Sequence, residues 1–110
     1  MNQQDYTAPL YPVRQSIKEA YQDVFQLMQV DGLTPDTSLS GAVVQIDLYA
    51  DKTQQRLGQG HYSWVSTNAV QVSLTQQQVG RLTRGRYRLE VSVTQAGNRE
   101  ELVHIILELV

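Results

Sequence analysis

The sequence predicts an all-β protein, namely an antiparallel β-sandwich of seven or eight short strands with one short helical turn near residues 75–80. β-branched and aromatic residues, which favour strands, are abundant, with 13 Val and 6 Tyr, whereas Ala, Glu and Lys are scarce. Apolar and polar residues alternate over several segments, and residues typical of turns separate these segments. The length of 110 residues fits one domain.

Composition excludes several kinds of site. The sequence contains no Cys, so disulfide scaffolds, cysteine zinc sites, iron–sulfur clusters and thiol catalysis are excluded. The formal net charge is −2, whereas nucleic-acid-binding domains are usually basic. No apolar run approaches the roughly 20 residues of a membrane helix, and residues 1–5 lack the regions of a signal peptide. We therefore expect neither nucleic acid nor a membrane as a partner.

Residues 1–12 are predicted to form an extended N-terminal arm, followed by one β-sandwich domain over residues 13–110. Pro9 and Pro12 fix their own φ and favour extended geometry in the residue before each. The alternative to a docking arm is a frayed tail. A docked arm would contact a neighbouring protein through three large side chains, Tyr6, Leu10 and Tyr11.

Residues 13–30 permit two interpretations. Residues 16–19 match a helix capping box, and apolar residues recur behind them at helical spacing. The same stretch also alternates with period two, and Asp31-Gly32 is typical of a hairpin turn as well as of a helix end. Because the rest of the chain is strand-like, we favour two strands, at about 13–17 and 20–30, and keep a helix as the alternative.

The other strands are predicted from alternation between turns. Thr75 is expected to cap the single helical turn. The predicted strands are 41–50, 54–58, 62–66, 69–74, 86–95 and 99–110. Three apolar rows are expected to face the core: Val44, Ile46 and Leu48; Val70, Val72 and Leu74; and Tyr87, Leu89, Val91 and Val93. In the last strand, one face carries Val103, Ile105, Leu107 and Leu109, and the other carries Leu102, His104, Ile106 and Glu108.

Leu82, Gly85 and Tyr87 form the pattern L-x-x-G-x-Y at the start of the strand at 86–95. This is the sequence form of a tyrosine corner, a feature of immunoglobulin-like sandwiches. Gly85 permits a sharp bend, and the Tyr87 hydroxyl is expected to bond to a backbone group a few residues upstream. The pattern predicts an immunoglobulin-like sandwich and a structural role for all three residues.

Four segments, taken in their order along the chain, resemble a known family. They are the Asp31-Gly32 turn and residues 39–46, 70–75 and 82–91. They look like the immunoglobulin-like β-sandwich modules of tailed-phage virion proteins, such as the N-terminal module of baseplate upper proteins. The resemblance covers about residues 13–110. It implies a structural role in a virion assembled in the host cytoplasm, without cofactor or catalysis. It also implies contacts with other virion proteins and with copies of the same chain.

Four arginines lie within eight residues and are candidate interface residues: Arg81, Arg84, Arg86 and Arg88. Arg86 and Arg88 share the strand face opposite Tyr87, so we expect them on the outer surface of a sheet. They could pair with acidic residues of a neighbouring subunit or contact nucleic acid, which the net charge disfavours. The structural alternative is cross-strand pairing within the chain, for instance with Glu100, Glu101 or Glu108.

Patterns of catalytic and metal sites are absent from the sequence. Nothing places His61 and His104 together or adds acidic ligands at a suitable spacing. Ser63 lacks the elbow that a nucleophilic serine needs. Asp47 and Asp51 flank a strand end and are expected to be solvated. We therefore predict no catalytic, cofactor-binding or metal-binding residue.

Tyr62 and Trp64 share one strand face, where they could belong to the core, to a protein interface or to a sugar-binding platform. A single Trp in a sandwich usually belongs to the core, which disfavours carbohydrate as a partner. The sequence thus predicts a non-enzymatic structural protein that acts through its arm and one sheet edge. A capsid decoration protein is the alternative within this class, and a carbohydrate-binding module is the alternative from another class.

Overall fold

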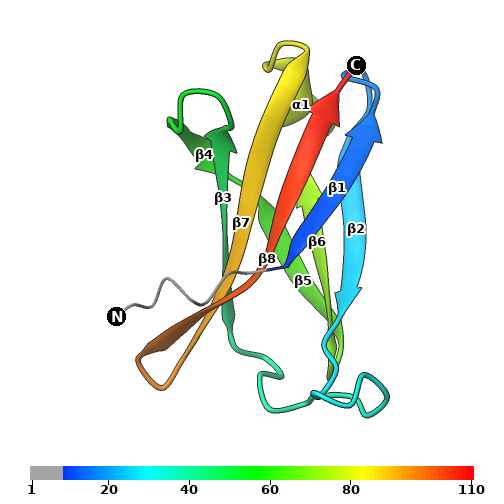
Figure 1. The fold of residues 1–110 in the computed structure, drawn as a ribbon, viewed down its shortest axis with the longest axis vertical. Helices are drawn as coiled ribbons and strands as arrows, with labels where there is room; N and C mark the ends of the chain where they lie inside the picture. The colour runs from blue at the N-terminus through cyan, green and yellow to red at the C-terminus, as the bar shows by residue number, and fades with distance from the viewer. Residues whose placement is uncertain (1–8) are drawn as a thin grey trace.

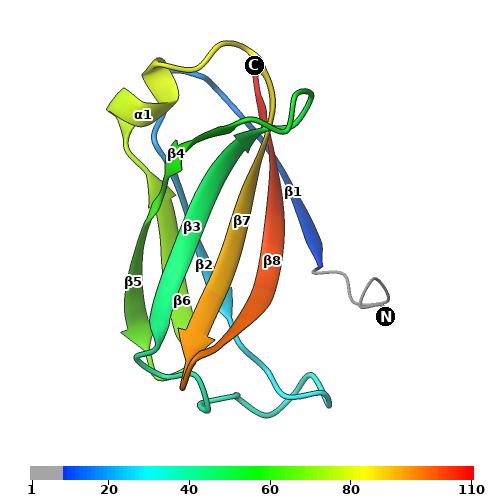
Figure 2. The ribbon, with the colours of Figure 1, turned by 90° about the vertical axis from the view of Figure 1, so that its left-hand side faces the viewer.

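The computed structural model describes residues 9–110, which form two β-sheets packed face to face (Figures 1 and 2). The five-stranded sheet has the order β1-β8-β7-β3-β4, and the three-stranded sheet has the order β2-β6-β5. The predicted β-sandwich with one short helical turn is confirmed. Its elements are β1 (Leu10–Gln15), β2 (Tyr21–Gln26), β3 (Val43–Ala50), β4 (Arg56–Gln59), β5 (His61–Ser66), β6 (Ala69–Leu74), α1 (Gln76–Gly80), β7 (Gly85–Gln95) and β8 (Asn98–Leu109).

The strand order is immunoglobulin-like. One sheet holds the counterparts of strands B, E and D, and the other holds those of G, F and C with an added strand beside C. The prediction of a wholly antiparallel sandwich is wrong for one pair, because β1 runs parallel to β8, with Leu10 opposite His104 and Gln15 opposite Leu109. The other strand pairs of residues 9–110 are antiparallel.

The stretch at residues 13–30 contains strands, so the helical alternative is wrong. The hydroxyl of Ser16 accepts a hydrogen bond from the Lys18 N–H at 3.1 Å, and the Ser16 carbonyl accepts one from the Glu19 N–H at 3.2 Å. The predicted capping box thus forms a turn that carries the chain from β1 in one sheet to β2 in the other (Figure 1).

The first strand begins at Leu10 rather than near residue 13. The last three residues of the predicted arm therefore belong to the sandwich, and Tyr6 lies outside the described residues. Pro12 fits this edge strand. The carbonyls of Pro9 and Gln15 accept hydrogen bonds from the N–H groups of His104 and Val110. Because backbone groups alternate in direction along a strand, those of Leu10, Pro12 and Arg14 face the free edge. A missing N–H at Pro12 costs the sheet no bond.

The core lies between the sheets and contains the predicted apolar rows. Side chains from β3, β7 and β8 in one sheet meet those of β6 in the other, and Tyr21, from β2, and Val79, from α1, join them. The two buried polar residues of the described chain are Asp47 and Ser92. Both lie on the other side of the five-stranded sheet from this core, as the alternation along β3 and β7 requires.

The chain passes from β4 in one sheet to β5 in the other at Gly60 (Figure 2). The Gly60 N–H donates a hydrogen bond to the Ile46 carbonyl at 2.9 Å. A Cβ at this position would lie 2.8 Å from Cγ2 of Ile46 and 3.1 Å from the Ser73 carbonyl oxygen. Such distances are shorter than van der Waals contact, so the crossing requires a residue without a side chain.

The corner residues lie at the entry to β7. The Tyr87 hydroxyl donates a hydrogen bond to the Thr83 carbonyl at 2.8 Å and accepts one from the Thr83 N–H at 3.1 Å. Gly85 has φ of +149°, a backbone conformation that residues with a side chain rarely adopt. Leu82 packs against the core. These contacts have the geometry of the tyrosine corner that the sequence pattern describes.

Candidate functional site

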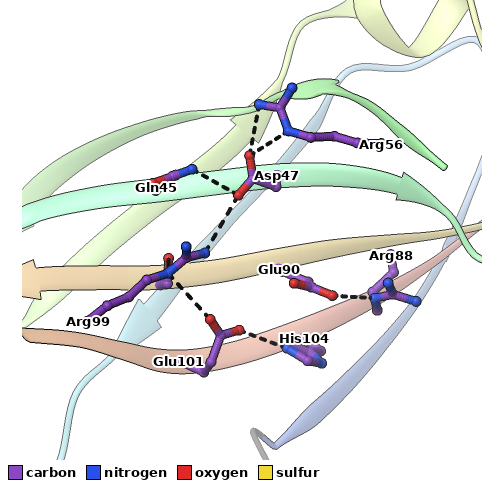
Figure 3. Close-up of polar contacts among 9 residues, drawn as sticks. Gln45, Asp47, Arg56, Arg88, Glu90, Arg99, Glu101 and His104 are labelled. Carbon is purple, nitrogen blue, oxygen red and sulfur yellow. Dashed lines mark hydrogen bonds and ion pairs between the residues drawn. The ribbon is translucent and has the colours of Figure 1, made fainter. Parts of the chain in front are cut away.

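The outer face of the five-stranded sheet carries a network of charged side chains (Figure 3). Here we call this network the polar face. Its members come from β3, β4, β7, β8 and the turn after β3: Gln45, Asp47, Asp51, Arg56, Arg88, Glu90, Ser92, Arg99, Glu101 and His104.

Asp47 is the centre of one half of the polar face. It is 3% exposed, which contradicts the expectation of a solvated carboxylate. Nε and Nη2 of Arg56 donate to its Oδ1 at 3.1 and 2.9 Å, and Gln45 donates to its Oδ2 at 3.1 Å. Burial of a carboxylate is costly unless such donors satisfy it. The Arg56 head group and the sheet together shield Asp47 from water.

Arg88 organises the other half of the polar face. Its Nε donates to Oε2 of Glu90 at 2.8 Å, and its Nη1 lies 3.4 Å from Oδ1 of Asp51. Its guanidinium carbon also lies 5.0 Å from the centre of the Tyr49 ring, within the range of a cation–π contact. Arg88 thus pairs with acidic residues of its own chain, as the alternative to a subunit contact predicted. Its partners are Glu90 and Asp51 rather than residues of β8.

A β-bulge in β8 lies between the two halves, where Arg99 links Glu101, at 3.7 Å, to Asp47, at 3.8 Å. Val91 pairs with Val103, but the next residue, Ser92, pairs with Glu101, so Leu102 is the extra residue. Strict alternation predicts that Leu102 and His104 share the outer face. Instead, Leu102 packs against the core, and Glu101 lies beside His104, with 3.0 Å between Oε1 and Nε2. Bulges of this kind redirect side chains.

The other predicted arginines are not gathered into one patch. Arg86 lies opposite Glu108 on the outer face, beside Arg14, in a shallow groove at the β1 edge. Arg81 follows α1, where its N–H donates to the Gln78 carbonyl at 3.3 Å, and Arg84 is exposed in the connection to β7.

The predicted arm residues that the structure describes point in different directions. Leu10 is 65% exposed and lies on the outer face. Tyr11 faces the space between the sheets, where its ring meets Phe25 edge to face at 5.0 Å. Both residues line an apolar cavity of about 260 Å³ at the open side of the sandwich. The edge beside them offers the N–H groups of Leu10 and Arg14, with Pro12 between them, so it is a poor template for an added strand.

A second candidate surface lies at the end of the molecule opposite α1 and the C-terminus (Figure 1). We call it the loop tip and define it as Met28, Val30 and Leu33. Val30 is fully exposed and Leu33 is 83% exposed. Leu27, Met28 and Gln29 are tied to residues 34–36 by a β-bridge and two backbone hydrogen bonds, so the loop that carries the tip has a defined shape.

Asp31 fixes the turn of this loop. Its carboxylate accepts hydrogen bonds from the Thr34 hydroxyl and from the N–H groups of Thr34 and Leu33. These bonds, that of the Thr34 hydroxyl above all, lower the pKa of Asp31 from its ordinary value, because they stabilise the charged form. The apolar side chains of the loop tip therefore stand on a turn that is closed by an ionised carboxylate at neutral pH.

Trp64 does not form an exposed platform. Its indole N–H donates to the Ala42 carbonyl at 2.9 Å, and its ring packs against the core. Tyr62, on the same strand face, is 41% exposed. His61 begins β5 and lies outside the polar face.

The chain was compared with protein-family models and with curated proteins. No family model matches the chain, and no curated protein matches its sequence. Within residues 9–110, no helix is long and apolar enough to cross a membrane, since α1 has five residues. The fold thus defines the class of the protein, an immunoglobulin-like β-sandwich.

Sequence reasoning missed the polar face and the loop tip. For the polar face, one signal was present in the sequence: Gln45, Asp47 and Glu90 alternate with core residues on neighbouring strands, so they had to share an outer surface. The position of Glu101 had no such signal, because alternation does not reveal where a bulge lies. For the loop tip, the Asp31-Gly32 turn was visible, but Met28 and Val30 were assigned to the strand or helix before it.

Proposed function

We propose that this chain is a non-enzymatic structural protein that acts through protein–protein contacts, as a component of a phage virion. The fold supports the proposal, because the resemblance of residues 39–46, 70–75 and 82–91 to virion modules implies the same kind of sandwich. Tail, baseplate, neck and fibre attachment are the places in a virion that such a module would occupy.

The loop tip is the observation that carries the proposal. Large apolar side chains fully in water on a well-defined loop mark a contact site, because their burial would be favourable by about 1.5–3 kcal/mol each. Gln95, in β7, donates to the Ser38 carbonyl at 2.9 Å and so ties the β2–β3 loop to the β7–β8 hairpin. In immunoglobulin variable domains, the corresponding two loops belong to the binding surface.

The polar face supports contact of a second kind. Most of its charges have partners within the chain, so this face is stiff, and it would contribute specificity rather than most of the affinity. Arg86 and Arg14, beside it, are exposed and would suit an acidic surface of a partner. This assigns the main contact to the loop tip and a secondary one to the edge of the sheet.

A capsid decoration protein would use the same surfaces, and only the position in the particle separates it from a tail protein. Trp64 is partly buried and donates to the Ala42 carbonyl, which favours a protein contact over the exposed aromatic platform of a carbohydrate-binding module.

Fractionation of a phage lysate tests the proposal. Particles are separated from soluble protein on a density gradient, and each fraction is analysed for this chain by quantitative mass spectrometry. We expect the chain in the particle fraction at a fixed ratio to the major virion proteins. Recovery of the chain in the soluble fraction alone would overturn the proposal. Separated heads and tails then distinguish a decoration protein from a tail protein.

A further inference from the structure

Three potential metal ligands meet on the polar face. The carboxylates of Glu90 and Glu101 and the imidazole of His104 each offer one donor atom, and these atoms all lie within 4.8 Å of one another. Glu90 and His104 are cross-strand neighbours in β7 and β8. Glu101 joins them because the bulge at Leu102 turns it to the same face (Figure 3). This arrangement is therefore built by the fold and not by a flexible tail.

The distances are close to those of a metal site. Ligands about 2.1 Å from a tetrahedral ion lie about 3.4 Å from one another. His104 and Glu101 already approach to 3.0 Å. Because all the separations are within 4.8 Å, reaching the ligand spacing needs a movement of at most about 1.4 Å. The side chain of Glu90 can supply it through a change of its χ angles, since all three groups are partly exposed.

The surroundings hold these ligands in place and keep the site attractive to a cation. Arg88 donates to one oxygen of Glu90, which leaves the second oxygen of that carboxylate for a metal, as arginines beside ligating carboxylates do. Arg99 bonds to Ser92 at 3.1 Å, and its charge is shared between Glu101, at 3.7 Å, and Asp47, at 3.8 Å. The carboxylates of the polar face outnumber its guanidinium groups, so the face keeps a formal negative charge when His104 is neutral.

From this geometry we propose that Glu90, Glu101 and His104 bind a zinc ion. One imidazole and two carboxylates suit Zn²⁺ better than Mg²⁺ or Ca²⁺, which prefer oxygen ligands alone. Three protein ligands leave one position of a tetrahedral ion open for water. The ion would join β7 to β8 across the bulge and would stabilise the folded chain, because an ion bound only by the folded state shifts the unfolding equilibrium.

Titration of the metal-free chain with ZnCl₂ tests the proposal. The full chain is dialysed against a chelator and then against buffer, and zinc binding is followed by calorimetry, by the melting temperature and by the NMR signals of the His104 ring. We expect one zinc per chain, a melting temperature that rises to saturation, and a shift of the His104 signals. His104→Ala should weaken binding at least tenfold, and His61→Ala, which alters the histidine outside the polar face, should leave it unchanged.

A second variant separates the loss of a ligand from damage to the fold. Glu101→Gln keeps the shape of the side chain and should weaken zinc binding while the melting temperature without zinc changes little. The proposal is wrong if the wild-type chain binds no zinc at about 0.1 mM ZnCl₂, at which a site with a Kd of that value is half occupied. It is also wrong if His104→Ala binds zinc as the wild type does, or if His61→Ala abolishes binding.

Discussion

Tyr87 satisfies two backbone groups at the point where the chain enters β7. Tyr87→Phe removes the hydroxyl and leaves the Thr83 carbonyl and N–H without this partner. We expect a loss of about 1–3 kcal/mol in the free energy of unfolding, measured with urea. Tyr62→Phe is the control, because its ring is far more exposed, and it should cost much less. Equal midpoints for the two variants would contradict the account of the corner.

Gly60 tests whether the crossing between the sheets is limited by space. Gly60→Ala would place a Cβ 2.8 Å from Cγ2 of Ile46, and Ile46 is a core residue with little room to move. We expect a loss of about 1–3 kcal/mol in the free energy of unfolding. Gly58, two residues earlier, has no atom within 4 Å of the position that a Cβ would take, so Gly58→Ala is the matched control. The account fails if Gly60→Ala unfolds at the same urea concentration as Gly58→Ala.

Single residues also show where sequence reasoning stops. Tyr87 and Gly85 could be assigned from a short pattern, because a corner depends on contacts within a few residues along the chain. Asp47 could not, because its burial depends on Arg56 from another strand and on Gln45 beside it. A sequence gives the face on which a carboxylate lies but not the side chains that cover it.

The first strand is the element whose limits decide how far the chain can be shortened from its N-terminus. Deletion of residues 1–8 keeps every contact among the described residues, so this variant is the reference for a longer deletion. Deletion of residues 1–12 also removes the pairing of Leu10, Tyr11 and Pro12 with β8 and the ring contact of Tyr11 with Phe25. We expect this longer deletion to cost at least about 1 kcal/mol, measured by urea unfolding. Identical midpoints for the two deletions would contradict the assignment of β1.

The loop that carries the loop tip should respond to acid. The pKa of Asp31 is lowered in the folded chain, so its contribution to the loop is present above the ordinary value of 3.8 and is lost as the pH falls through the lower folded-state value. The NMR signal of the Thr34 N–H should therefore titrate with a midpoint below 3.8. A peptide of residues 27–36 is the control and should titrate near the ordinary value. A midpoint at or above 3.8 in the folded chain would rule out the closed turn.

Most elements could be predicted, because alternation of apolar residues is a local signal. The strands from β3 to β8 lie within a few residues of their predicted limits. The direction of β1 was not predictable, since both directions bury Val13, and only its pairing with β8 decides between them. The bulge at Leu102 was hidden for the same reason, because it is a property of two paired strands.

At the scale of the whole molecule, the sandwich places two surfaces at different positions. The loop tip lies at one end, and the polar face covers the outer side of the five-stranded sheet (Figures 1 and 3). The fold class followed from composition and periodicity, whereas the surfaces did not, because a loop of apolar and turn residues has no period that reveals its exposure. The proposed role in assembly assigns the main contact to the loop tip.

Incorporation of loop-tip variants into particles tests this central claim most directly. The double variant Val30→Asp, Leu33→Asp places charges on the loop tip, and the control Gln77→Asp, Val110→Asp makes the same change of charge at the opposite end. The amount of each chain in gradient-purified particles is measured against the wild type by mass spectrometry, after circular dichroism has shown both variants folded. We expect the loop-tip variant to be depleted at least tenfold and the control to be incorporated normally. Normal incorporation of the loop-tip variant would contradict the claim.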